Sequence, residues 1–269
     1  MPKDDAAAPR HPVKRRPKAI RHPLIRHQPL GGNLGVTGAH HPDYSTAMHD
    51  SDPNHRLAQI RAAMASAAVQ AGRPTDATML IAVSKTHPAD SVRPLIAAGQ
   101  RVFGENRVQE AEQKWPALCE ETPGLALHLI GQLQSNKAEA AVALFDAIHS
   151  VDRVSLVTAL ARAMDKSGRR PACFLQVNIG DEPQKGGVPT AALAALIAQA
   201  RAADLPVAGL MCIPPAMIEP APYFALLAKL ARDHGLAGLS MGMSSDYETA
   251  ITIGATHIRV GSALFGERG

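Results

Sequence analysis

The stretch Leu80-Ile81-Ala82-Val83-Ser84-Lys85-Thr86 begins with four apolar residues and ends with three polar ones. A short apolar run rich in branched side chains is typical of a buried β-strand. A helical pattern over residues 88–98 follows almost at once. The stretch therefore predicts a strand that runs into a helix, with polar side chains at the carboxyl end of the strand.

The same unit recurs along the chain, and this alternation implies parallel strands joined by helical crossovers. Eight units in about 215 residues predict one α/β domain, a (β/α)8 TIM barrel. A doubly wound open sheet is the alternative fold, but it needs a glycine fingerprint that is missing after the first strand. The expected strands are 79–84, 101–105, 126–130, 147–151, 173–178, 207–211, 238–241 and 257–261, with helical stretches such as 88–98, 134–145, 153–167, 189–203, 220–233 and 246–253.

An extra helix is expected ahead of the first strand. Asp52-Pro53 offers an N-cap followed by proline at the first helical position. Apolar residues then recur at steps of three and four, until Gly72 and Pro74 end the pattern. The expected apolar face consists of Leu57, Ile60, Met64, Ala67, Ala68 and Ala71.

Residues 1–50 differ from the rest and predict a disordered basic extension, with the barrel over 51–269. Residues 1–47 hold eight Lys or Arg against three Asp, a net charge of +5, so the remaining chain carries −1 of the total of +4. A nucleic-acid-binding barrel therefore has no support from charge. The extension has three other interpretations: a transit peptide, a segment that touches RNA or anionic lipid, or a consequence of start-site choice ahead of Met48.

The composition, 46% hydrophobic and 19% charged, is that of an ordinary soluble protein. No apolar run is long enough to span a bilayer, so no membrane association is expected. Cys119, Cys173 and Cys212 lack CxxC spacing, which argues against a disulfide framework and a zinc site. We expect a cytoplasmic protein without a metal, because reducing conditions suit such scattered cysteines.

Polar and glycine residues gather at the carboxyl ends of the expected strands. In a barrel these ends form one rim, and that rim carries active sites. The clustering favours a single small-molecule site. The residues concerned are Ser84-Lys85-Thr86, Gly104-Glu105-Asn106, Gly131, 134–137, Asn178, 240–245 and 259–262.

Lys85 is the first candidate within that rim. Desolvation at a strand end would lower its pKa toward the neutral amine that Schiff-base chemistry needs. From position alone, a rim lysine whose ammonium reaches solvent is the more common outcome. Glu105 and Asn106 on the next strand either reach a ligand or cap the following helix.

The last two loops suggest a phosphate site, because phosphate sites in such barrels favour these loops and the N-terminus of a short helix. Ser244 offers a hydroxyl, and Gly261-Ser262 offers close backbone approach and a second hydroxyl. Plain helix capping is the alternative for each loop. Arg259 alternates with apolar neighbours and should point inward, toward either a ligand or an internal Asp or Glu partner.

Longer motifs support this picture. They stand at 82–86, 103–110, 128–137, 176–179 with Lys185, 209–211, 239–244 and 259–266. In their order and spacing over about residues 52–268 they resemble the YggS/PROSC family of pyridoxal phosphate homeostasis proteins. The resemblance implies a single barrel similar to the N-terminal domain of alanine racemase, with pyridoxal 5′-phosphate as the cofactor.

The resemblance also implies roles for individual residues. Lys85 would form the Schiff base, and Arg259 would face the pyridine nitrogen. The phosphate-binding residues would be Ser244, Gly261 and Ser262, and Asn106 and Ser240 would lie near the ring or the phosphate. Arg107 and Ser262 stand where the family commonly has tyrosine and threonine, and neither change threatens cofactor binding.

The implied function is that of a carrier that maintains vitamin B6 homeostasis, with no catalytic residue. Alanine racemase takes a tyrosine base from a second domain, for which a chain ending at residue 269 has no room. We therefore expect a monomer whose partners are the cofactor and the apo-enzymes that use it. A small amino-acid racemase or lyase is the alternative, and a module acting through the basic extension is a third hypothesis.

Overall fold

The computed structural model describes residues 52–266. The predicted disordered extension over 1–50 lies outside the described residues. Helix α2 (Pro53–Gln70) begins as the sequence predicts, because the Asp52 side chain accepts the Asn54 N–H at 2.9 Å. Its buried face comprises Leu57, Ile60, Met64, Ala67 and Ala68.

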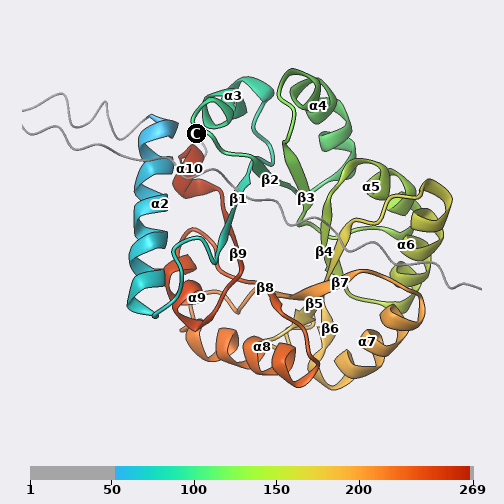
Figure 1. Cartoon of the computed structure of the whole chain (residues 1–269). Coiled ribbons are helices and arrows are strands. Elements are labelled where there is room, and N and C mark those ends of the chain that lie inside the picture. Colours follow the sequence, from blue (N-terminus) through green and yellow to red (C-terminus); the bar gives the residue numbers. More distant parts are fainter. Residues whose placement is uncertain (1–51, 267–269) are drawn as a thin grey trace, which may run out of the picture. The chain divides into compact units, whose positions relative to one another are not determined.

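Eight of the strands in the described range close into a parallel barrel. The first, β1 (Met79–Val83), pairs on one side with β2 (Val102–Glu105) and on the other with β9 (His257–Val260). The ring continues through β3 (Ala126–Leu129), β4 (Ala147–Val151), β5 (Ala172–Asn178), β7 (Val207–Cys212) and β8 (Gly238–Ser240). Closure through the β4–β5 pairing confirms the TIM barrel and excludes the open sheet (Figure 1).

Helices surround the ring (Figure 1). Their apolar faces pack against the outer face of the barrel, and this layer forms the main hydrophobic core. After α2 they are α3 (Ala89–Ala97), α4 (Val108–Glu121), α5 (Ala138–Leu144), α6 (Val154–Ser167), α7 (Leu193–Ala202), α8 (Ala221–Asp233), α9 (Tyr247–Ile253) and α10 (Ser262–Phe265), with 3-10 turns η1 (Ser135–Lys137) and η2 (Thr190–Ala192).

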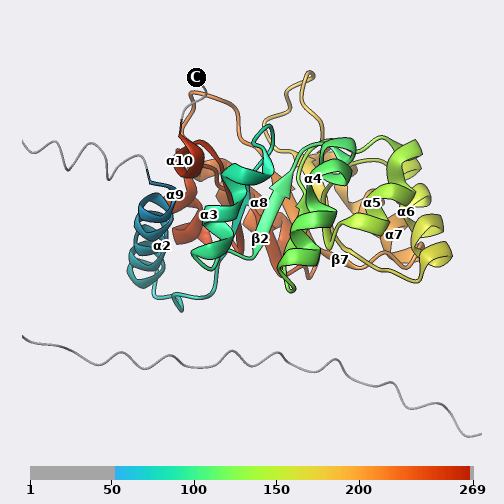
Figure 2. The same ribbon diagram turned by 90° about the horizontal axis from the view of Figure 1, so that it is seen from above.

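One of the predicted helical ranges begins with a strand in the structure. The sequence predicts a helix over 189–203, but a two-residue strand β6 (Val188–Pro189) precedes η2 and α7. Proline cannot donate a hydrogen bond to a sheet interior, and among the strands of residues 52–266 β6 pairs only with β5. Figure 2 shows a yellow and an orange loop rising beyond the helices, on the side where α10 begins.

None of the described helices is both long enough and apolar enough to cross a membrane.

The barrel interior departs from the usual filling of branched aliphatic residues. Phe174 stacks on His149 at a centroid distance of 4.3 Å and meets His257 edge-on at 4.9 Å. The centre of the barrel is therefore aromatic and polar rather than aliphatic.

Candidate functional site

A cavity of about 610 Å³ opens at the carboxyl ends of the strands. That volume suits a small molecule, since ligand pockets range from about 300 to 1,000 Å³. Six of the seven residues proposed from the sequence line it: Lys85, Asn106, Ser244, Arg259, Gly261 and Ser262. The seventh, Ser240, is fully buried below the wall.

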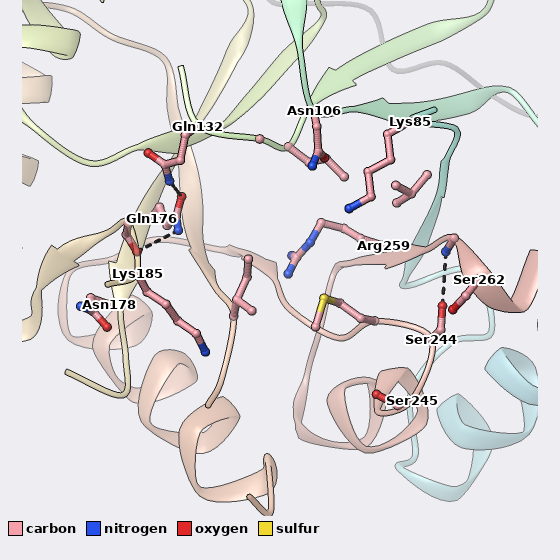
Figure 3. A pocket seen from close by; sticks show the side chains of 17 residues that line it. Lys85, Asn106, Gln132, Gln176, Asn178, Lys185, Ser244, Ser245, Arg259 and Ser262 are labelled. Carbon is pink, nitrogen blue, oxygen red and sulfur yellow. Dashed lines mark hydrogen bonds between the residues drawn. The ribbon is translucent and has the colours of Figure 1, made fainter. Parts of the chain in front are cut away.

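Lys85 lies two residues beyond the end of β1 and points into the cavity (Figure 3). The backbone around it is held from α4, because Lys114 Nζ donates to the carbonyls of Ser84 at 2.8 Å and His87 at 2.9 Å. Between these anchors Thr86 has φ +65°, a left-handed conformation that is costly for a β-branched residue. Contacts from another element therefore maintain a strained turn next to Lys85.

A buried ion pair fixes Lys114. Its Nζ lies 2.6 Å from Glu105 Oε1, and the two side chains are 7% and 0% exposed. The same oxygen accepts from Ser84 Oγ at 2.7 Å and Trp115 Nε1 at 3.0 Å. A buried carboxylate needs such partners. Glu105 therefore neither lines the cavity nor caps a helix; together with Lys114 and Trp115 it forms what we call the Lys85 clamp.

Arg259 comes from β9, the neighbour of β1, and is 5% exposed. Its Nη1 donates to Ser240 Oγ at 2.7 Å, and its Nη2 donates to the Cys212 carbonyl at 2.9 Å. None of the ion pairs within residues 52–266 includes it, so the alternative of an internal Asp or Glu partner is wrong. Burial lowers the pKa of the guanidinium, because neutral acceptors replace water only in part.

Ser244 joins the two loops that the sequence singled out. Its Oγ accepts the N–H groups of Gly261 at 3.3 Å and Ala263 at 3.4 Å, at the start of α10. The capping alternative assigns the serine to its own helix, α9, but the Asp246 carboxylate occupies that loop and accepts the Met243 N–H at 2.6 Å. Ser244 therefore organises the neighbouring backbone at the cavity wall.

Two glycines lie in close contact with neighbouring backbone at the rim. A Cβ on Gly131 would lie 2.3 Å from the Asn106 carbonyl oxygen, which no side chain tolerates. A Cβ on Gly261 would lie 3.3 Å from both the Cβ and the carbonyl oxygen of Val83. Gly131 thus lets Asn106 reach the cavity, and Gly261 keeps α10 close to β1.

On the other side of the cavity, the sequence singled out only Asn178, as a polar residue at a strand end, and no residue there was proposed to bind the ligand. Figure 3 shows Gln132, Gln176, Asn178 and Lys185 on the side of Arg259 away from Ser244. Gln132 donates to Gln176 at 2.6 Å, and Lys185 lies 2.6 Å from Glu182 Oε2. Polar residues at alternate positions near the end of β5, Gln176 and Asn178, were the available signal.

Two buried histidines, His128 and His149, and the half-buried His257 lie beneath Arg259. Burial lowers the pKa of His128 to about 3 and that of His257 to about 4, and it holds the pKa of His149 well below its usual value. All three rings are therefore neutral near pH 7. His128 is hydrogen-bonded inside the barrel and does not line the cavity.

The model of the family described as "Alanine racemase, N-terminal domain" matches residues 56–269. The pyridoxal phosphate homeostasis protein of Escherichia coli (strain K12) is 39% identical over 236 residues, which cover 81% of this chain and 97% of that protein. The protein of the same name from Pseudomonas aeruginosa PAO1 is 42% identical over 224 residues, which cover 79% and 94%.

Among solved structures, PipY of Synechococcus elongatus PCC7942 with PLP bound is 43% identical, with a TM-score of 0.70. The match covers 80% of this chain and 100% of that one. The closed barrel and the matched range define the class, the alanine racemase N-terminal domain proteins. Within that class the chain belongs to the family of pyridoxal phosphate homeostasis proteins, which confirms the resemblance found in the motifs.

Proposed function

We propose that this protein binds pyridoxal 5′-phosphate in the rim cavity, holds it as a Schiff base on Lys85, and so carries and buffers the cofactor. One observation carries the proposal: a lysine, a buried arginine with uncharged partners and a hydroxyl-bearing helix start all line one cavity of about 610 Å³. The names of the relatives and the PLP-bound structure of PipY support the choice of ligand.

The residues fit the two ends of such a ligand. Ser244, Ser262 and the backbone at the start of α10 would hold the phosphate, because hydroxyls and N–H groups at a helix start favour anions. Lys85 lies on the neighbouring strand end and would supply the amine. Asn106 would contact the ring from the end of β2.

Arg259 would face the pyridine nitrogen. When bound, the cofactor supplies a reactive aldehyde and a ring that withdraws electrons. Arginine only donates hydrogen bonds, so it favours the unprotonated ring, which withdraws electrons weakly. Such a pairing suits a reversible tether better than a strong electron sink.

The lining also favours a carrier over a catalyst. Within the described range, its titratable side chains are Lys85, Lys185 and Arg259. Lys185 is engaged by Glu182 and donates to the Pro214 carbonyl at 2.9 Å, and Arg259 is engaged by Ser240 and Cys212. A small racemase is the second candidate, because Lys185 approaches from the side away from Ser244 and would have to act as the base (Figure 3).

Borohydride reduction tests the tether. The protein incubated with pyridoxal phosphate should give an imine absorbance band, and reduction should fix the cofactor mass on the peptide that contains Lys85. Lys85→Ala should lose both signals, while Lys166→Ala, at a lysine that is 69% exposed on α6, should keep them. Covalent trapping that persists at full yield in Lys85→Ala would contradict the proposal.

Turnover separates the two candidates. We expect no racemisation of L-amino acids above the rate with free cofactor. A robust rate that disappears in both Lys85→Ala and Lys185→Ala would establish the racemase instead.

We also propose that the protein acts as a cytoplasmic monomer that passes the cofactor to apo-enzymes. Light scattering should give the mass of one chain, 28.4 kDa. Addition of a PLP-dependent apo-enzyme to the loaded protein should restore activity to the apo-enzyme.

A further inference from the structure

A line of uncharged hydrogen-bonding groups leads from Arg259 into the barrel. Ser240 Oγ, which accepts from Arg259, lies 2.8 Å from His149 Nδ1. His149 Nε2 in turn lies 3.1 Å from His128 Nδ1. We call Ser240, His149 and His128 the barrel chain; all three are buried, with exposures of 0%, 0% and 6%.

The direction of donation along the barrel chain follows from its first member. Arginine can only donate, so Ser240 Oγ accepts from Arg259, and its own hydroxyl proton is directed to His149 Nδ1. His149 then carries its proton on Nε2 and donates to His128 Nδ1. The reverse tautomer of His149 would leave the hydroxyl proton of Ser240 without an acceptor among the hydrogen bonds in the described residues.

The surroundings hold the barrel chain in one arrangement. The His149 ring stacks on Phe174 with an interplanar angle of 16°, which restricts its rotation. Burial disfavours its charged form, as does the positive charge of Arg259. A neutral and immobile imidazole is therefore a fixed acceptor for Ser240.

We propose that Ser240 and His149 are positioning residues for ligand binding: they fix the Arg259 guanidinium so that its remaining donors serve the cavity. The inference rests on the proposed function, since it assigns support for the group that would face the pyridine ring. Without the barrel chain the guanidinium would populate several orientations, and the ligand would bind only the competent fraction.

Cofactor affinity tests the inference. Ser240→Ala and His149→Leu should each weaken pyridoxal phosphate binding by about tenfold, the order expected when one hydrogen bond to a charged group is lost. Both should also shift the pH midpoint of the imine absorbance band, because the donor at the ring has moved. His149→Asn keeps an acceptor near the position of Nδ1 and should recover most of the affinity.

His257→Leu is the matched control. This histidine has a centroid distance of 5.8 Å to His149, but its Nδ1 bonds to Thr256 Oγ1 rather than to Ser240. Its loss should leave the affinity within about twofold, since no donor to the cavity changes. Unchanged affinity and midpoint in folded Ser240→Ala and His149→Leu would overturn the inference, whereas a wild-type protein that fails to bind would overturn the proposed function instead.

Nitrogen NMR of the unsubstituted protein tests the same inference without depending on the folding of a variant. In the ligand-free protein His149 should show a protonated Nε2 and an unprotonated Nδ1 above pH 6. A proton on Nδ1 would reverse the barrel chain and refute its role.

Discussion

Lys85 and Arg259 line one cavity from neighbouring strands, but a charged ion pair supports the first and neutral hydrogen-bonding groups support the second. Behind Lys85 lies the clamp, a charged and buried ion pair that grips the backbone on both sides of the residue. Behind Arg259 lies the barrel chain, whose neutral groups begin with the hydrogen-bond acceptor of the guanidinium, Ser240. The comparison indicates that the fold fixes a turn in the first case and a guanidinium in the second.

The difference also sets the charge of the cavity. The only carboxylate of the clamp, Glu105, is paired with Lys114, and the hydrogen-bond acceptors of Arg259 are uncharged. The positive charge of Arg259 is therefore compensated only weakly within its surroundings. Such a cavity should attract an anionic ligand such as a phosphate ester.

Disruption of the Lys85 clamp should have the largest effect on the free energy of unfolding. Lys114→Met leaves the Glu105 carboxylate buried without its cation, which should cost about 3–5 kcal/mol of unfolding free energy. Urea denaturation measures the loss. Lys166→Met breaks an exposed pair with Glu139, at side chains 69% and 67% exposed, and should cost less than about 1 kcal/mol. Equal losses in the two variants would show that the clamp carries no special stability.

Acid should destabilise the protein through protonation of His128 in the barrel chain. The pKa of this residue is about 3 in the folded protein and near 6.5 in the unfolded chain, so the unfolded chain binds more protons between these values. The contribution of the neutral His128 ring to the free energy of unfolding is fully present above pH 6.5. It should fall by about 2–3 kcal/mol by pH 4.5. Unfolding at several pH values should show a shallower decline in His128→Gln; an identical decline would remove His128 as the cause.

Removal of the guanidinium should separate stability from binding. Arg259→Met should weaken cofactor binding by about thirtyfold, because a charged donor to the ligand is lost. The unfolding free energy should stay the same or rise, since an apolar chain replaces a buried charge without a carboxylate partner. Parallel titration and thermal melting check both; a strongly destabilised variant would contradict the comparison.

Ser244→Ala should change stability and cofactor affinity least among these variants. Loss of the acceptor for two N–H groups at α10 should cost about 1 kcal/mol and weaken cofactor binding a few-fold. The neighbouring Ser245 also lines the cavity but, among the described residues, does not accept from that backbone, so Ser245→Ala is the matched control. Isothermal titration with phosphate and with pyridoxal phosphate would locate the loss at the phosphate end.

Much of the site could be predicted because it depends on local pattern. Lys85 and Ser262 lie just beyond the ends of predicted strands, and a parallel barrel brings such positions to one rim. Ser240 also ends a strand, but it points into the barrel one layer below the cavity. Depth along the barrel axis depends on strand tilt, which a single sequence does not reveal.

The clamp could not be predicted for a different reason. It joins the backbone on both sides of Lys85 to Lys114 on α4, a helix absent from the predicted ranges. Pro116 inside that helix interrupts the pattern that indicates a helix interior. The partners of a buried charge depend on packing between elements, and periodicity within one element does not contain that information.

The pairing of β1 with β9 has a consequence for biosynthesis. Met79 pairs with His257 and Ile81 with Arg259, so opposite ends of the barrel sequence build adjacent walls of the cavity. A nascent chain emerges from the ribosome in order, and contacts between such distant segments form late. Lys85 therefore leaves the ribosome long before Arg259 and Ser262 can join it, and a chain that is truncated during synthesis cannot assemble the cavity.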